Sequence, residues 1–239
     1  GAEVAIASKL LEYVQLPEIG KIDENLAPSF VSIYWGGAMI GRLTTSVISS
    51  RKYELGKKLI YGLLTSAVTF IVLLCAVSIF MRIDFNGVEL RWSEIVNTFN
   101  IMWPLLPFLA IQFILMIIFR NSTRYALTAF SVVSLFLLII AFAVQGEIAM
   151  WSMISIGLFN SIMWSNIFTL SIEDLKEYTS QGSSLLVIMI VGGAFIPMLM
   201  GLISDAFDLR TAYLLPIISY LYISFFGLRG TIKPVTQHE

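Results

Sequence analysis

The sequence predicts an all-α bundle of transmembrane helices, and three observations lead to this fold class. The 239 residues are 57% hydrophobic and only 13% charged, whereas soluble domains are roughly 45–50% apolar and 25% charged. The mean hydropathy is +0.84. The apolar residues also come in runs of about 20, which is the length that crosses a bilayer as a helix. We therefore expect an integral membrane protein.

Seven segments are long and apolar enough for membrane spans, which need roughly 17–25 residues. They are 29–48, 59–81, 101–119, 125–144, 148–171, 184–203 and 211–228. Residues 1–14 are apolar but too short to span alone. We expect them to be the remaining part of an eighth span that is truncated.

Basic residues are unevenly divided between alternate connectors, which predicts the orientation of the spans. One set of alternate connectors is rich in basic residues. The other set holds few, and acidic residues offset their charge. The richer set, and with it the C-terminus, should be cytoplasmic. Its basic residues are Arg51, Lys52, Lys57, Lys58, Arg120, Arg124, Lys176, Arg229 and Lys233.

Residues 88–100 are too polar to span and predict a short amphipathic helix. One helical face carries Trp92, Ile95, Val96 and Phe99. Such a helix can lie in the outer membrane interface. An ordinary loop helix packed on the bundle fits the pattern as well.

Several functional classes are disfavoured by composition. The net charge is −1 without a basic block, so nucleic acid is not an expected partner. The single Cys75 excludes an internal disulfide, and the single His238 lies in the polar tail. With no carboxylate pair inside a span, we expect no catalytic residues, no metal site, no cofactor and no enzyme activity.

Two amides and an indole lie in the apolar segment 148–171, where unpaired polar groups are costly. Asn160 and Trp164 are four residues apart, so they should share a helix face with Gly157. An amide that bonds hydroxyls beside an indole that covers C–H groups suits a sugar. Asn166 is about 120° away and should face a neighbouring helix. Alternatively, both asparagines form hydrogen bonds between helices, and Trp164 only packs against neighbouring side chains.

The span at 29–48 combines small, aromatic and charged residues. Gly37 and Gly41 form a pair of small residues that lets a second helix approach closely. Trp35 and Arg42, seven apart, lie on one face. Arg42 either extends toward the cytoplasm or caps a neighbouring helix, or it forms a charge pair in an inner gate.

The segment 184–203 has small residues and a proline at a spacing of four: Gly193, Pro197 and Gly201. Proline bends a helix, so the segment suits a helix that flexes against its neighbours, although a static packing kink is the alternative. Near the beginning, Glu3 stands in an apolar segment. It could bind a hydroxylated ligand or carry a proton.

Five blocks of the sequence resemble one transporter family. They are GAEVAIASKLLEYV, VSIYWGGAMIGRL, IGLFNSIMWSNIFTL, YTSQGSSLLVIMIVGGAFIPMLMGLISD and LLPIISYLYISFFGLRG. In this order they resemble the second half of the fucose:proton symporter family, which includes glucose/galactose transporters, in the major facilitator superfamily. The resemblance implies two six-helix halves with the sugar between them, and a bacterial inner-membrane location. It also implies that Glu3, Trp35, Asn160 and Trp164 lie near the sugar.

Two departures from the family pattern are visible. The family usually has Phe-Pro-Thr where this chain has Trp164, Ser165 and Asn166, and loss of the proline should straighten the helix. The family also expects one span between Arg51 and the 148–171 helix, where we find three. We therefore expect 59–119 to be a two-helix insertion and 125–144 to be the ordinary ninth helix.

The resemblance and the residues together predict the C-terminal half of a secondary active sugar transporter. Its mechanism would be sugar:cation symport by alternating access. The expected partners are a sugar, the lipid bilayer, an N-terminal six-helix half and a coupling cation, with protons as the expected ion. The proton-carrying acidic residues of the family lie in that N-terminal half. The alternative is a membrane sugar sensor or scaffold that keeps the fold without transport.

Overall fold

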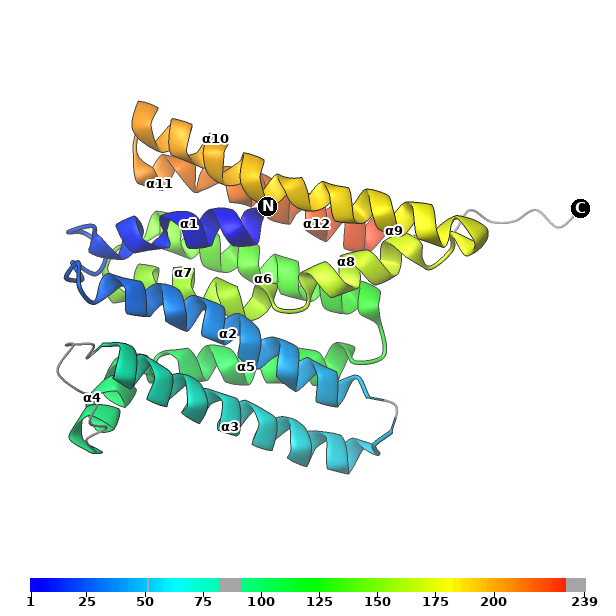
Figure 1. Ribbon diagram of the computed structural model, residues 1–239, viewed down its shortest axis with the longest axis horizontal. Coiled ribbons are helices and arrows are strands. Elements are labelled where there is room, and N and C mark those ends of the chain that lie inside the picture. The colour runs from blue at the N-terminus through cyan, green and yellow to red at the C-terminus, as the bar shows by residue number, and fades with distance from the viewer. Residues whose placement is uncertain (51, 82–91, 231–239) are drawn as a thin grey trace, which may run out of the picture.

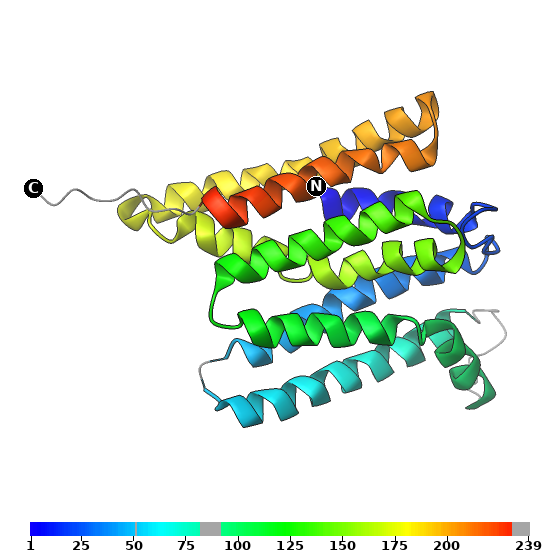
Figure 2. The same cartoon turned by 180° about the vertical axis from the view of Figure 1, so that it is seen from behind.

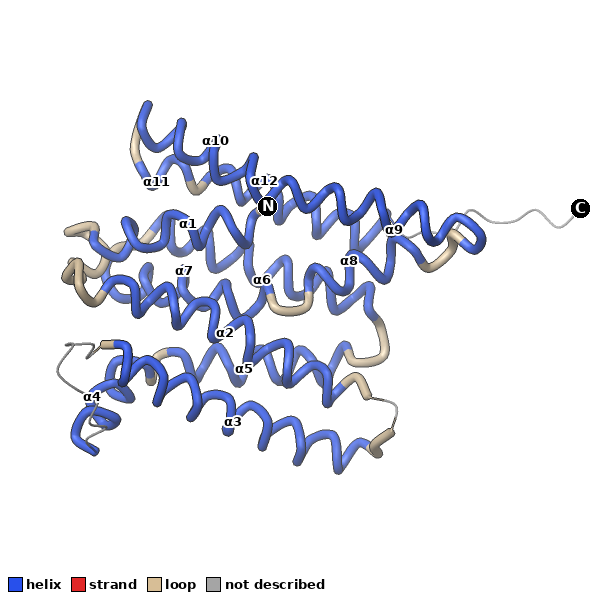
Figure 3. Tube along the Cα trace, in the orientation of Figure 1, coloured by secondary structure: helices blue, strands red, loops and turns tan. Residues whose placement is uncertain are grey.

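The computed structural model describes residues 1–50, 52–81 and 92–230, and these parts of the chain are helices joined by short connectors (Figure 3). The predictions that involve Arg51, residues 88–91, Lys233 and His238 lie outside the described residues. Each predicted span corresponds to a helix or to a pair of helices. The helices are α1 (Ala2–Gln15), α2 (Ala27–Ile48), α3 (Leu55–Phe80), α4 (Trp92–Met102), α5 (Leu105–Phe119), α6 (Thr123–Ala143), α7 (Gly146–Asn160), α8 (Met163–Ile172), α9 (Thr179–Ile188), α10 (Gly192–Ala206), α11 (Leu209–Ala212) and α12 (Leu214–Phe225).

Length and hydropathy identify five membrane spans within the described residues, namely 55–80, 123–143, 146–172, 176–206 and 209–229. A sixth is present if α4 and α5, which are bent by 63° relative to each other, count as one span. The helix α2 has 22 residues and is long enough, but Arg42 lowers its hydropathy. The protein is therefore a multi-pass, all-α membrane protein.

The connectors alternate between the two ends of the bundle. The α1–α2, α6–α7 and α10–α11 connectors lie at one end together with α4, and the α2–α3, α5–α6 and α8–α9 connectors lie at the other (Figures 1 and 2). A hydrogen bond of 2.8 Å from the Gly146 N–H to the Glu18 carbonyl joins the first residue of α7 to the α1–α2 connector at the first end. The grouping is the one that the basic residues predicted. Which end is cytoplasmic stays a prediction.

The helix α7 lies at the centre of the bundle. Every residue from Ala149 to Asn160 is buried, as expected for a helix that is apolar on all sides. It contacts α1, α2, α5 and α6. In contrast, α3 and α5 lie together along one edge of the bundle (Figures 1 and 2). The predicted insertion at 59–119 covers most of α3, α4 and α5, and its status as an insertion stays a prediction.

The span 146–172 is interrupted, which corrects the expectation of a straight helix. The helix α7 ends at Asn160 and α8 begins at Met163, with a turn at Ser161 and Ile162 between them. No proline is present. The Ser165 hydroxyl donates to the Ile162 carbonyl at 3.0 Å, and such local side-chain bonds compete with the helical ladder. The two residues Asn160 and Trp164 therefore belong to different helices.

Candidate functional site

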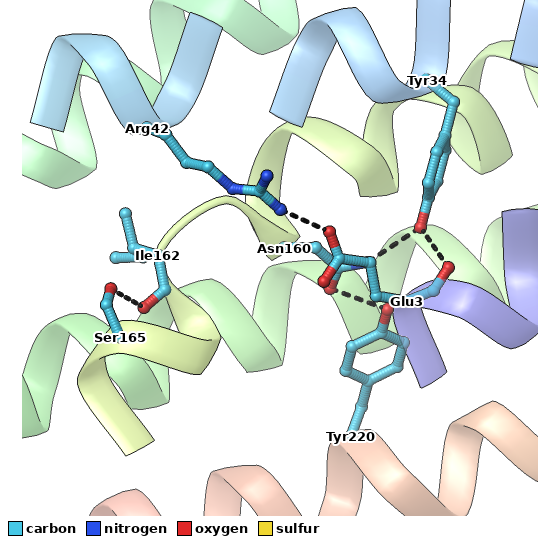
Figure 4. A network of polar contacts seen from close by, with 7 residues as sticks. All are labelled: Glu3, Tyr34, Arg42, Asn160, Ile162, Ser165 and Tyr220. Carbon is cyan, nitrogen blue, oxygen red and sulfur yellow. Dashed lines mark hydrogen bonds and ion pairs between the residues drawn. The ribbon is translucent and has the colours of Figure 1, made fainter. Parts of the chain in front are cut away.

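Glu3 and Arg42, which the sequence identified separately, form an ion pair between α1 and α2. Glu3 Oε1 lies 2.8 Å from Arg42 Nη2, and the side chains are 24% and 54% exposed respectively (Figure 4). Arg42 therefore points to a carboxylate on the neighbouring helix, which fits the charge-pair interpretation better than the snorkelling one.

Asn160, at the end of α7, is the centre of a hydrogen-bond network that joins four helices. Its Nδ2 donates to the Tyr34 hydroxyl on α2 at 3.0 Å, and its Oδ1 accepts from the Tyr220 hydroxyl on α12 at 2.9 Å. The Tyr34 hydroxyl in turn donates to the Glu3 backbone carbonyl on α1 at 3.0 Å. One amide thus links α1, α2, α7 and α12 into a single polar network (Figure 4).

Glycines allow α2 and α7 to approach closely enough for this network. A Cβ built on Gly157 would lie 2.9 Å from Tyr34 Cδ2 and 3.0 Å from the Tyr34 carbonyl carbon, so no larger residue fits without movement. A Cβ on Gly37 would be in ordinary contact with Leu158, 3.5 Å from its backbone nitrogen. The small-residue pair at Gly37 and Gly41 therefore faces α7 and the turn that follows it.

Glu3, Asn160 and Trp164 line one small pocket. Its volume is about 90 Å³, well below the roughly 300–1,000 Å³ of an enclosed ligand site. Asn160 is only 3% exposed, whereas Trp164 is 42% exposed. The pocket is thus polar at the Glu3 and Asn160 side and aromatic at the Trp164 side. The lining residues are Gly1, Ala2, Glu3, Asn160, Met163, Trp164, Ile167, Tyr220 and Ile223.

Trp35 does not line this pocket, although it borders the same network. Its ring lies 5.5 Å from the Tyr34 ring in an edge-to-face arrangement, and the residue is 39% exposed. Trp35 and Arg42 are both on α2, so an exposed aromatic ring and an exposed cation lie on the helix that holds Tyr34.

The remaining predicted residues lie away from the polar network. Pro197 lies inside α10, which follows a short 3₁₀ segment at Met189–Val191. A Cβ on Gly193 would be 3.7 Å from Val4 of α1, whereas Gly201 has open space beside it. Asn166 lines a different small cavity near Arg120. Whether these residues act in gating or in packing stays a prediction.

Two residues of the network were missed by sequence reasoning, namely Tyr34 and Tyr220. Both are fully buried. A tyrosine inside a membrane span usually finds a partner for its hydroxyl, and this signal was present in the sequence. Their partner could not be chosen without the packing of α2 and α12.

The side chains at and beside this pocket include both donors and acceptors of hydrogen bonds. A carboxylate, a guanidinium, an amide and an exposed indole lie at or beside one pocket within a membrane bundle. Among the described residues, no group of acidic, histidine or cysteine side chains could hold a metal ion.

Comparison with known proteins identifies relatives among sugar transporters. The chain is 32% identical over 231 residues to a glucose/galactose transporter of Brucella abortus (strain 2308), which covers 97% of the chain and 39% of the relative. It is 26% identical over 235 residues to a putative glucose/galactose transporter of Helicobacter pylori (strain 26695), covering 96% of the chain and 40% of the relative. It is also 31% identical over 112 residues to the L-fucose-proton symporter of Escherichia coli K12, covering 46% of the chain and 26% of the relative.

No protein-family model matches the chain, and no solved structure matches it. The chain spans about two fifths of the length of the glucose/galactose transporters that it matches. These relatives are transporters and not enzymes. The chain is therefore a homologue of about two fifths of these glucose/galactose transporters and, over a shorter stretch, of the L-fucose-proton symporter.

Proposed function

We propose that this chain is the C-terminal half of a secondary active sugar transporter that works by sugar:cation symport. The observation that carries the proposal is the polar network inside the membrane bundle, where Glu3 and Arg42 pair beside the pocket of Asn160 and Trp164. Ionisable residues inside spans are rare and usually mark a substrate or ion pathway. The proposed substrate class is a sugar because the relatives include glucose/galactose transporters and L-fucose-proton symporters.

In this proposal the sugar contacts both polar and aromatic groups. The Glu3 carboxylate accepts hydrogen bonds from sugar hydroxyls, and the Arg42 guanidinium balances the negative charge of that carboxylate. Trp164 and Trp35, which are partly exposed, cover the apolar C–H faces of the ring. Asn160 is at the floor of the pocket. An amide has two N–H protons and two acceptor lone pairs, so its one bond at each end leaves capacity for a ligand hydroxyl.

The residues that line the pocket of about 90 Å³ form one wall of a larger cavity, which an N-terminal six-helix half completes. This follows from the general plan of such transporters, in which the substrate binds at the interface of two repeats near the middle of the membrane. The chain spans only about two fifths of the length of these relatives, which is consistent with a second half in the complete transporter. Protons are the proposed coupling ion, since some relatives are named proton symporters.

Alternating access requires helices that can change shape, and two are available. The α7–α8 span is interrupted at Ser161 and Ile162 next to the pocket, and α10 contains Pro197. We propose that these two breaks absorb the movement when the cavity opens to one side or the other. We also propose a bacterial inner membrane location with the C-terminus in the cytoplasm, on the basis of the basic connectors.

One observation favours a second candidate, a sugar sensor or scaffold that does not transport. Asn160 is buried and hydrogen-bonded at both ends within the chain, as expected for a residue that only fixes helices. Uptake of labelled glucose, galactose and fucose by the full-length protein in proteoliposomes separates the two. Transport predicts uptake that a proton gradient accelerates. Sugar binding without uptake under any gradient would instead support the sensor.

A further inference from the structure

An apolar groove of about 650 Å³ lies between α3 and α5, the two helices along the edge of the bundle (Figures 1 and 2). The helix α3 packs mainly on α2, and α5 packs on α6, α7 and α2, so a hollow is left between the two edge helices. Most of the lining residues are three or four positions apart, which places them on one face of each helix. We call this hollow the α3–α5 groove. Its lining residues are Leu63, Ser66, Ala67, Phe70, Ile71, Leu74, Phe99, Leu106, Leu109, Ala110, Phe113 and Ile114.

The α3–α5 groove has a buried floor and exposed rims. Phe70 and Phe113 are buried. A Cβ built on Gly62 of α3 would lie 3.1 Å from the Phe113 ring, so this ring reaches α3 and forms part of the floor. Ile71 and Ile114 also line the groove but are more than half exposed. The groove is therefore open to the medium outside the bundle.

The lining of the groove is almost entirely hydrocarbon. Ser66 contributes the only polar side chain among the described lining residues, and its hydroxyl is already hydrogen-bonded to the Thr44 hydroxyl on α2 at 2.8 Å. An apolar cavity without free polar partners stays dry, and an unfilled one forfeits dispersion contacts along its walls. The groove therefore fits an apolar occupant rather than water or a sugar.

The groove lies at the depth of the lipid hydrocarbon. The helix α3 is a membrane span of 26 residues from Leu55 to Phe80. At about 1.5 Å per residue, the stretch from Leu63 to Leu74 covers about 17 Å and leaves about 12 Å of helix before it and about 9 Å after it. A hydrocarbon core about 30 Å thick that is centred on α3 surrounds this whole stretch. Acyl chains are the medium at that depth.

The width of the groove favours an acyl chain over a helix. Spread over about 17 Å of α3, a volume of about 650 Å³ corresponds to a channel roughly 7 Å wide. An α-helix with its side chains is about 10–12 Å across, so a helix would have to force the rims apart, whereas an extended hydrocarbon chain is much thinner. Ala67 and Ala110 are the smallest lining residues, and both are exposed. Their size leaves the middle of the groove wide.

We propose that the α3–α5 groove binds an acyl chain of a membrane phospholipid. The chain lies along the stretch from Leu63 to Leu74 and contacts α3 and α5 at the same time, in place of direct packing between these two spans. Such contacts rest on van der Waals packing, since hydrocarbon already surrounds the helices in a bilayer. No charged side chain is among the described lining residues, so the site selects a hydrocarbon chain and not a headgroup. The proposal does not depend on sugar transport.

The site is tested by photolabelling the full-length protein in nanodiscs with a phosphatidylethanolamine that carries a diazirine in one acyl chain. Ile71 and Val72 are a matched pair, because these neighbours on α3 are 55% and 54% exposed but only Ile71 lines the groove. A chain held in the groove predicts several times more label on Ile71 than on Val72. Lipid that only surrounds the bundle would label both residues alike, and equal labelling would overturn the proposal.

Filling the groove should remove the preference for Ile71. Ala67→Leu combined with Ala110→Leu narrows the middle of the groove and should lower the labelling of Ile71 to the level of Val72. The control is Ala76→Leu, which should leave the preference unchanged, because Ala76 is exposed on α3 but does not line the groove. A preference that survives the double substitution would contradict a chain in the groove. If the double variant does not fold, the comparison of Ile71 with Val72 in the wild type still decides.

A second copy of the protein is the competing occupant, and cysteine crosslinking distinguishes it. In a background without other cysteines, including Cys75→Ala, a second copy on the groove would give disulfide-linked dimers of Ile71→Cys or Ile114→Cys and would exclude the labelled lipid. The acyl-chain site predicts no such dimers. Dimers together with weak labelling of Ile71 would overturn the proposal. A lack of sugar uptake by the wild type would count against the proposed function only, because the labelling and crosslinking results do not depend on transport.

Discussion

Asn160 and Tyr34 are 126 positions apart in the chain and are joined by a 3.0 Å hydrogen bond from the amide to the phenol oxygen. The bond connects the last residue of α7 to the middle of α2, and the other end of the amide accepts from Tyr220. The network therefore stabilises the meeting point of four helices in addition to any contact with a sugar. This double role leads to the first prediction.

Replacing Asn160 with Ala should destabilise the bundle by about 2 kcal/mol, because two hydrogen bonds are lost at roughly 1 kcal/mol each. The buried Tyr220 hydroxyl is also left without its acceptor, whereas the Tyr34 hydroxyl keeps its bond to the Glu3 carbonyl. In a double-mutant cycle, Asn160→Ala and Tyr34→Phe should be less than additive. Thermal unfolding of the full-length protein in detergent gives the values. Additive effects would show that the bond contributes nothing to stability.

The Glu3–Arg42 ion pair should matter more for transport than the Lys9–Glu12 ion pair on α1. Glu3→Gln or Arg42→Gln should each lower sugar uptake at least about tenfold, equivalent to ~1.4 kcal/mol. The control is Glu12→Gln, which breaks the 2.8 Å pair with Lys9 on the same helix. Such pairs contribute only about 0.2–0.5 kcal/mol. Equal effects of the Glu3 and Glu12 changes on uptake would contradict a functional role of the pair.

The close contact at Gly157 predicts that alanine substitutions at Gly157 and at Gly201 have very different effects on stability. A methyl group at Gly157 would collide with the Tyr34 backbone, whereas one at Gly201 would meet open space. Gly157→Ala should therefore lower stability by roughly 1–3 kcal/mol, while Gly201→Ala should be neutral or slightly stabilising because alanine favours helices. Unfolding midpoints of the two variants provide the comparison. A stable Gly157→Ala protein would mean that α2 and α7 are farther apart than described.

Cysteine labelling tests the predicted orientation. In a background without other cysteines, including Cys75→Ala, Asn121→Cys lies in the α5–α6 connector and Gln145→Cys lies in the α6–α7 connector. Both positions are exposed and are at opposite ends of the bundle (Figure 1). A membrane-impermeant reagent applied to intact cells should label Gln145→Cys and leave Asn121→Cys unmodified. The reverse pattern would invert the proposed topology.

The spans could be predicted from the sequence because they depend on local properties. An apolar run of about 20 residues forms a helix in lipid regardless of its neighbours, since only internal hydrogen bonds satisfy the backbone there. This is why α3, α6 and α12 correspond to predicted segments. The alternation of connectors follows from the same segments.

The details of the site depend on packing and could not be predicted. Glu3 and Arg42 were identified as polar residues in spans, but their pairing requires the contact of α1 and α2, which lie 39 positions apart at these residues. The interruption at Ser161 carries no proline or glycine signal. It becomes visible only with the Ser165 hydroxyl bond to the Ile162 carbonyl and with Gln112 of α5 beside it.

In the proposed transporter, the pocket of Glu3, Asn160 and Trp164 opens to a water-filled cavity that accepts sugar. The most direct test is sugar protection of Ile167→Cys, which lines this pocket, in a cysteine-free full-length transporter. The control is Ile218→Cys on α12, where the side chain is 64% exposed on the bundle surface and should face lipid. A hydrophilic thiol reagent should modify Ile167→Cys only, and glucose, galactose or fucose should slow this reaction. An Ile167→Cys protein that is as unreactive as Ile218→Cys, or that no sugar protects, would contradict the claim.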